Sequence, residues 1–513
     1  MKIKRSSRTH KTVLNAGASI IDTVIKLFIK FASRYVFIIT LGQQYLGVSA
    51  LFSSIITMLS LADLGFSIAL PQSLYDPLAK KDEQRICSLM KFYEKVYAII
   101  CVAVIVIGLA LLPFLPLIIN MEEANEISHI YLIYILFILQ SAASYLFIYK
   151  RTLFTADQKN HYISIIECIV SVVSTLVQIA ILFFWKNYIL YLVTSIVFIV
   201  AQNVYISAQC NKKYPFLKDM KSSPSLSKAE TRDLTKKVYA LFIYKVANAV
   251  ESGTDNMIMT ACVGLIITGL CSNYTLVITS LSGILLMAMA AATSSIGNLI
   301  VTESKERTYE VYQLLTFIGF WLYGVCAICL VVLLDPFIKI WLGEEYLITI
   351  SAVIVLCLNF YITGVQNVNS NFRNAYGLFY EGRYRPVLMI IVNIGSSIIL
   401  AKWIGVTGIF IGTLLSRVLT VGIFDPYIVY KYGLHANLRE YYLYHCKYHV
   451  VALIIGSIIF LSFSQWRVSS FLMLVIKAIV VFLYVNIAFF IVFHKNRYFL
   501  EAIMRIKGIF GDK

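Results

Sequence analysis

The sequence predicts an all-α integral membrane protein, and three observations support this prediction: composition, long apolar segments and the distribution of basic residues. Of the 513 residues, 59% are hydrophobic and only 14% are charged, with a mean hydropathy of +0.79. A soluble globule of this length needs more polar surface than such a chain can provide. The composition therefore excludes a soluble globular protein and indicates a multi-pass membrane protein.

About fourteen apolar runs are long enough, at roughly 20 residues each, to cross the hydrocarbon layer of a membrane as helices. These predicted spans lie near residues 13–38, 46–73, 92–118, 130–149, 161–184, 188–208, 238–264, 270–301, 311–334, 347–369, 387–401, 405–424, 448–464 and 471–493. Little polar sequence separates the two spans within 387–424.

Basic residues are concentrated on one side of these spans. With the N-terminus placed in the cytoplasm, the inner segments hold 33 of the 44 Lys and Arg residues, the outer loops hold four, and seven lie within spans. Inner loops of membrane proteins carry such an excess of positive charge. We therefore expect both termini to be cytoplasmic, in a multi-pass protein of the cell (inner or plasma) membrane. The net charge of +17 reports this orientation and does not indicate a nucleic-acid partner.

The longest polar segment divides the spans into two groups. Residues 209–237 are rich in Ser and Lys, as a basic cytoplasmic linker should be. The second spans of the two halves match weakly at a separation of 222 residues, at Gly47, Phe52, Ile56, Thr57, Leu59 and Ser60 against Gly269, Tyr274, Ile278, Thr279, Leu281 and Ser282. These matches indicate a parallel repeat.

The predicted organisation is two pseudo-symmetric six-helix lobes followed by two further helices. The N-lobe covers residues 1–208, the linker 209–237 and the C-lobe 238–427, and residues 428–513 hold two accessory helices and a cytoplasmic tail. Transporters built from two such lobes bind their substrate between the lobes, near the midplane of the membrane.

The first span carries a stripe of charge. Asp22, Lys26, Lys30 and Arg34 recur at every fourth position, so on a helix they lie on one side. A Lys or Arg at the centre of a spanning helix costs about 2.5 to 3.5 kcal/mol, which favours a helix that lines a cavity or binds an anion. In the alternative interpretation Asp22 pairs with Lys26 and Arg34 reaches the outer surface, which leaves Lys30 unexplained.

The seventh span is polar as well. Lys245, Asn248, Glu251, Ser252 and Asp255 fall within an arc of about 120° on a helix, again unsuited to lipid. This span is the repeat-mate of the first helix. The alternative is a local salt bridge that stabilises one lobe.

Single charges elsewhere do not form a metal site. Glu167, Arg417 and Lys477 are isolated within their spans, and any of them could close an ion pair inside a lobe. Cys326 and Cys329 form a Cys-x-x-Cys in mid-span but have no second ligand pair nearby. We expect no metal centre, and the ten cysteines are interpreted as small core residues.

Several short motifs occur in an order that resembles a known family. They are Leu61-Ala62-Asp63-Leu64-Gly65-Phe66, Ser252-Gly253-Thr254-Asp255, Trp341-Leu342-Gly343-Glu344-Glu345-Tyr346, Gly377-Leu378-Phe379 and Arg383-Tyr384-Arg385-Pro386, followed by Asn393, Gly405, Gly408 and Gly412-Thr413. The chain resembles the Wzx-like polysaccharide-transport branch of the multidrug/oligosaccharidyl-lipid/polysaccharide (MOP, MATE-like) superfamily.

The resemblance implies a flippase, not an enzyme, that carries an undecaprenyl-pyrophosphate-linked oligosaccharide from the inner to the outer leaflet by alternating access. Lys30 and Arg34 would hold the diphosphate, assisted by Lys26 or Arg417, because guanidinium and ammonium groups bind compact anions strongly. Asp22, Glu251 and Asp255 are candidates for coupling or gating. No cofactor is expected beyond a coupling cation, H⁺ or Na⁺.

The expected partners are the lipid-linked oligosaccharide and the bilayer, with a polysaccharide polymerase and glycosyltransferases of the same pathway, and the protein is expected to be a monomer. Two other functions remain open. A flippase for a lipid-linked peptidoglycan precursor shares the fold and the anionic lipid. A cation-coupled multidrug exporter shares the fold but would need an acidic cavity, whereas the first span holds more bases than acids.

Overall fold

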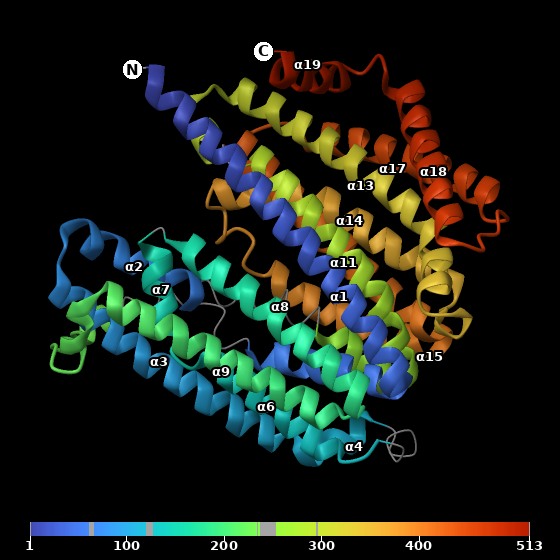
Figure 1. The fold of residues 1–513 in the computed structure, drawn as a ribbon. Helices are drawn as coiled ribbons and strands as arrows, with labels where there is room; N and C mark the ends of the chain where they lie inside the picture. Colours follow the sequence, from blue (N-terminus) through green and yellow to red (C-terminus); the bar gives the residue numbers. More distant parts are fainter. Residues whose placement is uncertain are drawn as a thin grey trace. The chain divides into compact units, whose positions relative to one another are not determined.

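The structure, a computed structural model, describes residues 2–60, 66–119, 127–157, 159–232, 234–235, 253–293 and 296–511. The regular structure in these ranges is entirely helical, without a strand. Internal contacts divide the chain into two compact units, Met1–Gly253 and Thr254–Lys513, each built from its own helices (Figure 1).

The first unit contains the helices that the sequence assigns to the N-lobe. They are α1 (Lys2–Leu59), α2 (Phe66–Lys80), α3 (Glu83–Ala110), the short η2 (Leu112–Phe114) and α4 (Leu115–Ile118), α6 (Ile130–Tyr145), α7 (Ile148–Ala156), α8 (Asn160–Trp185), α9 (Tyr188–Lys213) and η3 (Pro215–Met220).

The second unit contains the remaining helices. They are α11 (Leu265–Thr293), α12 (Ile296–Thr302), α13 (Lys305–Trp341), η4 (Glu344–Tyr346), α14 (Ile350–Ala375), α15 (Arg385–Leu419), α16 (Val421–Ile428), the π-helical η5 (Val429–Leu434), α17 (Leu438–Phe463), α18 (Phe471–Phe493) and α19 (Arg497–Gly511). The helix α19 was not predicted from the sequence, because it is too polar to be a span.

Within the described ranges, ten helices are long and apolar enough to cross a membrane, or up to eleven if the bent pair Ile130–Tyr145 and Ile148–Ala156 forms one span. Three differences account for the gap between eleven and the predicted fourteen. Most of the predicted span 238–264 lies outside the described residues, and α1 and α15 each join two predicted spans. The number fourteen and the cytoplasmic termini stay predictions.

Both joined helices break at a glycine. Gly42 in α1 has φ +86°, a conformation that side-chain-bearing residues rarely adopt, and it separates the predicted spans 13–38 and 46–73. The second of these spans is shorter than predicted, because its helix ends at Leu59 and a new helix begins at Phe66.

The break in α15 is a tight antiparallel hairpin. Gly405 has φ +58°, and beyond it the chain runs back along the first arm of the helix. A Cβ on Gly408 would lie 2.2 Å from the Leu400 carbonyl oxygen, and one on Gly412 would lie 2.4 Å from Ser397 Oγ. The two arms approach so closely that only glycine fits at these positions. The predicted spans 387–401 and 405–424 are therefore separate helices, as the sequence indicated.

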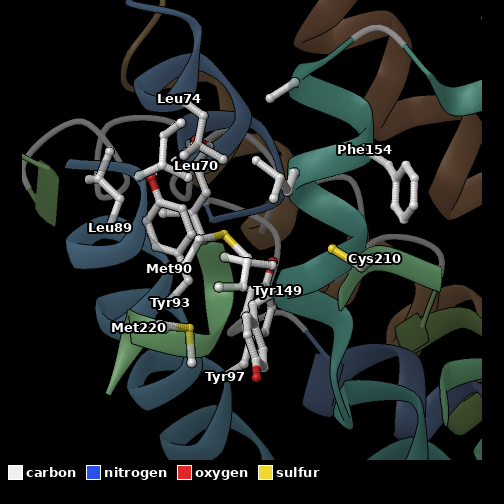
Figure 2. Packing of buried hydrophobic residues seen from close by; sticks show 14 of the residues in the cluster. Leu70, Leu74, Leu89, Met90, Tyr93, Tyr97, Tyr149, Phe154, Cys210 and Met220 are labelled. Carbon is white, nitrogen blue, oxygen red and sulfur yellow. Dashed lines mark hydrogen bonds between the residues drawn. The ribbon is translucent and has the colours of Figure 1, made fainter. Parts of the chain in front are cut away.

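A large apolar cluster packs several helices together at one end of the first unit (Figure 2). It includes Leu70 and Leu74 of α2, Tyr93 of α3, Tyr149 of α7 and Met220 of η3, all of them buried. Met220 lies in the segment that the composition predicts to be a linker. The cluster therefore joins that segment to α2, α3 and α7.

The predicted linker 209–237 packs on the first unit through some of its described residues, while most of the others are exposed. Lys91 of α3 donates hydrogen bonds to the carbonyl oxygens of Lys221 (2.9 Å) and Ser223 (2.8 Å), and Arg85 pairs with Glu230 at 2.7 Å. The hydrogen bond from Arg85, followed by those from Ser227, lowers the pKa of Glu230 to about 2. The packing depends on apolar residues scattered among the Ser and Lys residues. The overall composition of the segment does not reveal them.

Candidate functional site

The stripe of basic residues on α1 lines a cavity of about 330 Å³ inside the first unit. Three helices enclose it: α1, α8 and α9. Its lining consists of Lys26, Ile29, Lys30, Ser33, Arg34, Phe37, Ser49, Ser171, Val172, Thr175, Gln178 and Tyr191. The structure thus places all three predicted cations of the first helix in one cavity.

The cavity is basic. None of the described residues that line it is acidic, whereas it carries three cations together with serine, threonine, glutamine and tyrosine side chains. Lys26 and Arg34 are half-buried and Lys30 is exposed. Arg34 lies close to Tyr188 and Tyr191 of α9. Such a set of cationic and hydroxyl donors suits an anionic group with several oxygen atoms.

Aromatic packing fixes the shape of this site around the break at Gly42. The ring of Tyr188 lies 5.3 Å from that of Phe37 and 5.5 Å from that of Tyr45, so it packs against α1 on both sides of the glycine. Edge-to-face contacts of this kind stabilise a fixed geometry. They hold Arg34 and Ser49, which lie on opposite sides of the break, at the same cavity.

The contribution of α8 was not predicted from the sequence. Ser171, Thr175 and Gln178 are spaced by four and three residues and form one polar face that lines the cavity. This spacing within an otherwise apolar helix was the available signal. This signal is weak, because a hydroxyl group in a membrane helix can donate its hydrogen bond to a backbone carbonyl of the same helix. Thr175 donates in this way to the Ser171 carbonyl oxygen at 2.8 Å.

Other predicted site residues lie elsewhere or outside the described part. The side chain of Asp22 and the whole of Glu251 and Lys245 are outside the described residues, so the alternative pairing of Asp22 with Lys26 stays a prediction. Arg417 belongs to α15 in the second unit and does not line this cavity. Its backbone carbonyl accepts a weak hydrogen bond from Gln366 at 3.4 Å.

Asp255 forms a second polar cluster, in the second unit. Thr413 donates to its Oδ2 at 2.8 Å, and Asn393 Nδ2 lies 3.5 Å from its Oδ1. Asn393 also donates to Thr413 Oγ1 at 3.1 Å and accepts from Thr254 at 3.3 Å. The cluster joins the helical residues 254–262 to both arms of the α15 hairpin. One carboxylate surrounded by amide and hydroxyl oxygens can hold a proton or a small hard cation.

The isolated charges in the spans do close local contacts. Glu167 of α8 pairs with Arg151 of α7. Lys477, which is 1% exposed, donates to the Trp466 carbonyl oxygen at 3.0 Å. Glu167 thus forms an ion pair within the predicted N-lobe, whereas Lys477 makes a hydrogen bond to a carbonyl oxygen within the accessory segment 428–513.

A buried ionic cluster in the second unit was not predicted. Asp425 of α16 is fully buried and pairs with Arg373 of α14 at 2.7 Å and with Arg385 of α15 at 3.2 Å. Ser370 donates to the same carboxylate at 3.1 Å. The cluster ties three helices together, and each of its two arginines pairs with the one buried carboxylate.

Comparison with known proteins identifies the fold. No family model and no curated protein sequence matches the chain. Among solved structures, an inward-facing multidrug resistance MATE transporter of the MOP superfamily matches with TM-score 0.64 and 12% identity, over 79% of this chain and 94% of that one. The lipid II flippase MurJ in an inward closed conformation matches with TM-score 0.65 and 14% identity, over 93% and 99%.

A MATE transporter of Vibrio cholerae matches with TM-score 0.51 and 11% identity, over 80% of this chain and 96% of that one. Identities this low establish a common fold and no more. The protein is a multi-pass, all-helical membrane protein. Its fold is the one shared by MATE transporters and the lipid II flippase of the MOP superfamily.

Proposed function

We propose that this protein is a flippase that moves an undecaprenyl-pyrophosphate-linked oligosaccharide, such as an envelope, capsular or exopolysaccharide repeat unit, from the inner to the outer leaflet by alternating access. The observation that carries this proposal is the basic cavity of the first unit, where Lys26, Lys30 and Arg34 meet without an acidic residue among the described lining. Two linked phosphates are a compact polyanion with many acceptor oxygens, which these donors match.

The cavity binds the diphosphate region rather than the whole oligosaccharide in this proposal. Its volume of about 330 Å³ lies at the lower end of the range for small-ligand sites, which is about 300–1,000 Å³. The hydroxyl groups of Ser33 and Ser171 supply further donors beside the cations, whereas that of Thr175 donates to the Ser171 carbonyl oxygen. Lys30, which is the most exposed of the three cations, makes the first contact with the incoming anion.

The alternatives share the fold but differ in their demands on this cavity. A multidrug exporter that takes up organic cations would face three repelling charges here, so the basic lining disfavours it. A peptidoglycan-precursor flippase would use the same donors for the same type of anionic lipid. The larger share of the chain matched by the lipid II flippase, 93% against 79% for the multidrug transporter, favours a lipid carrier of either kind.

Coupling belongs to the Asp255 cluster in this proposal. The carboxylate and the oxygens of Thr254, Asn393 and Thr413 would accept H⁺ or Na⁺, and occupancy of the site would change how the α15 hairpin packs against residues 254–262. Asp22 and Glu251 remain candidates for the same role. The expected location is the cell membrane, where the protein works as a monomer beside the polymerase and glycosyltransferases of its pathway.

Transport of fluorescent undecaprenyl-diphosphate-linked sugar in proteoliposomes tests the function. The wild-type protein should expose the lipid at the opposite leaflet, and the Lys30→Ala, Arg34→Ala double variant should not. The control is the Lys186→Ala, Lys402→Ala double variant, which removes two exposed cations that do not line the cavity and should transport normally. Transport of organic cations with no transport of the lipid would establish the exporter instead.

A further inference from the structure

The helix α19 has two different faces, and only one of them is covered by the second unit. It begins at Arg497, shortly after α18 ends at Phe493, and Figure 1 shows it turning away from the direction of α18. A span that ends at Phe493 leaves α19 at the boundary of the membrane. The count of basic residues predicts that this boundary is the cytoplasmic one.

The covered face packs on α13 through aromatic rings. Phe499 is 9% exposed, and its ring stacks on that of Trp321 at 5.1 Å. The ring of Phe490 in α18 lies 5.8 Å from the ring of Phe499. Arg497 pairs with Glu310 of α13. These contacts fix the orientation of α19 on its own unit.

The outer side of α19 combines exposed apolar residues with positive charge. Leu500 is 48% exposed and Met504, one turn later, is 63% exposed. Residues 305–310 and 495–505, which meet here, contain five basic and three acidic residues. Glu310 and Glu501 are engaged by arginines, since Arg497 pairs with the first and Arg505 lies 2.7 Å from the second. The surface is therefore apolar and net positive.

We propose that α19 lies in the plane of the membrane surface and binds anionic phospholipid headgroups, with Leu500 and Met504 inserted among the acyl chains. An amphipathic helix with basic residues beside its apolar face binds anionic membranes in this way. The continuity with α18 places the helix at the bilayer, which favours lipid over a soluble protein as the occupant. The basic residues at the start of α13 form part of the same surface.

Lipid binding by α19 is independent of the identity of the substrate. A lipid-bound α19 would fix the inner end of α13, on which Phe499 and Arg497 rest. The composition of the membrane would then affect a helix of the transport unit directly.

The test uses the full-length protein in nanodiscs of phosphatidylcholine with or without phosphatidylglycerol. An environment-sensitive fluorophore is attached at Met504→Cys in a background with Cys262→Ser and Cys446→Ser, which removes the two exposed cysteines of the described chain. A second label at Lys221→Cys, an exposed position of the packed linker, is the aqueous reference. The label at 504 should be blue-shifted and quenched by brominated lipid, more so with phosphatidylglycerol, and the label at 221 should not.

The Lys495→Gln, Arg505→Gln variant should lose the difference between the two lipid compositions, whereas Lys218→Gln, Lys228→Gln should keep it. Equal quenching in neutral and anionic discs of the parent protein would overturn the headgroup part of the proposal. A label at 504 that is as accessible to water as the label at 221, or that is shielded only after cytosolic proteins are added, would overturn it entirely.

Discussion

The first helix of the first unit and the first described helix of the second unit carry opposite chemistry. On α1, Lys26, Lys30 and Arg34 line a cavity without an acid among its described residues. At the start of the second unit, Asp255 is held by Thr413 and Asn393. The sequence repeat predicts that these two helices are equivalent. The difference teaches that two helices predicted to be equivalent carry unlike polar groups: cations that line a cavity in the first unit and a hydrogen-bonded carboxylate in the second.

The cations discussed in the second unit lie in different surroundings from those of the first unit. Arg373 and Arg385 are buried, and a fully buried carboxylate lies between them. The cations of α1 instead line an open space among hydroxyl groups. Buried arginines around a carboxylate indicate a structural role, and cations that line a cavity indicate a binding role. Mutations in the two regions should therefore fail in different ways.

The largest expected effect is loss of transport on removal of two cavity cations. Hydrogen bonds to charged groups contribute about 1.5–3 kcal/mol each, so Lys30→Ala with Arg34→Ala should weaken transport of the lipid-linked sugar by at least about 100-fold. Membrane insertion and thermal stability should be unchanged or improved, because costly charges have been removed. Lys30→Arg should retain part of the activity. Normal initial rates from the double variant would show that the cavity is not required for transport.

The second effect is on stability and tests the opposite region. Asp425→Asn leaves two buried guanidinium groups without their carboxylate, which costs about 3–5 kcal/mol for a buried pair. The melting temperature in detergent, followed by size-exclusion chromatography, should fall sharply. Arg373→Gln is the matched change of a cation in this region, and it should also destabilise the protein, whereas Lys30→Gln should not. Equal melting temperatures for all three variants would erase the distinction between the two kinds of cation.

The third effect concerns coupling. Asp255→Asn keeps the size and much of the hydrogen bonding with Thr413 but deletes the charge. Coupling free energies are typically about 1–3 kcal/mol, so we expect roughly tenfold less stimulation of transport by an ion gradient, with lipid binding unchanged. Rates are measured in vesicles with H⁺ and Na⁺ gradients imposed separately. An unchanged gradient response would make Asp255 a structural residue and direct the search to Asp22 or Glu251.

The smallest effect is expected at an exposed pair that is neither buried nor in a cavity. Arg85 lowers the pKa of Glu230 to about 2, so the pair contributes stability above the unfolded pKa of about 4.3 and loses it as the pH falls toward 2. Because the pair is exposed, Glu230→Gln should change melting at pH 7 only slightly. The wild-type advantage should vanish near pH 2. If Glu230→Gln loses transport at neutral pH, segment 209–237 has a role in transport besides the small contribution of this ion pair to stability.

The sequence predicted the cations of the candidate site but not the polar residues of α8 that line the same cavity. Charged residues in an apolar helix are easy to recognise. The spacing of four residues between Lys26, Lys30 and Arg34 by itself predicts that they share one side of a helix. Ser171, Thr175 and Gln178 of α8 carry only a weak signal of this kind, because uncharged polar groups are tolerated on more faces of a membrane helix than charges are. Their approach to α1 depends on tertiary packing around Tyr188, which a periodicity does not contain.

The same limit explains the missed features of the second unit. Asp425 lies 52 residues from Arg373 and 40 from Arg385, and neither separation is marked in the sequence. The turn at Gly405 was predicted by the division between spans 387–401 and 405–424, because a turn between two apolar runs is a local property. The packing of the linker was missed, since it depends on a few apolar side chains that reach a cluster formed by distant helices.

The most direct test of the central claim is binding by the purified protein. Titration with undecaprenyl diphosphate and with undecaprenol, which shares the tail but lacks the phosphates, separates recognition of the anion from recognition of the hydrocarbon chain. We expect the wild-type protein to bind the diphosphate at least about tenfold more tightly, and the Lys30→Ala, Arg34→Ala variant to bind both lipids alike. If the variant retains the full preference for the diphosphate, the cavity on α1 is not the anion site.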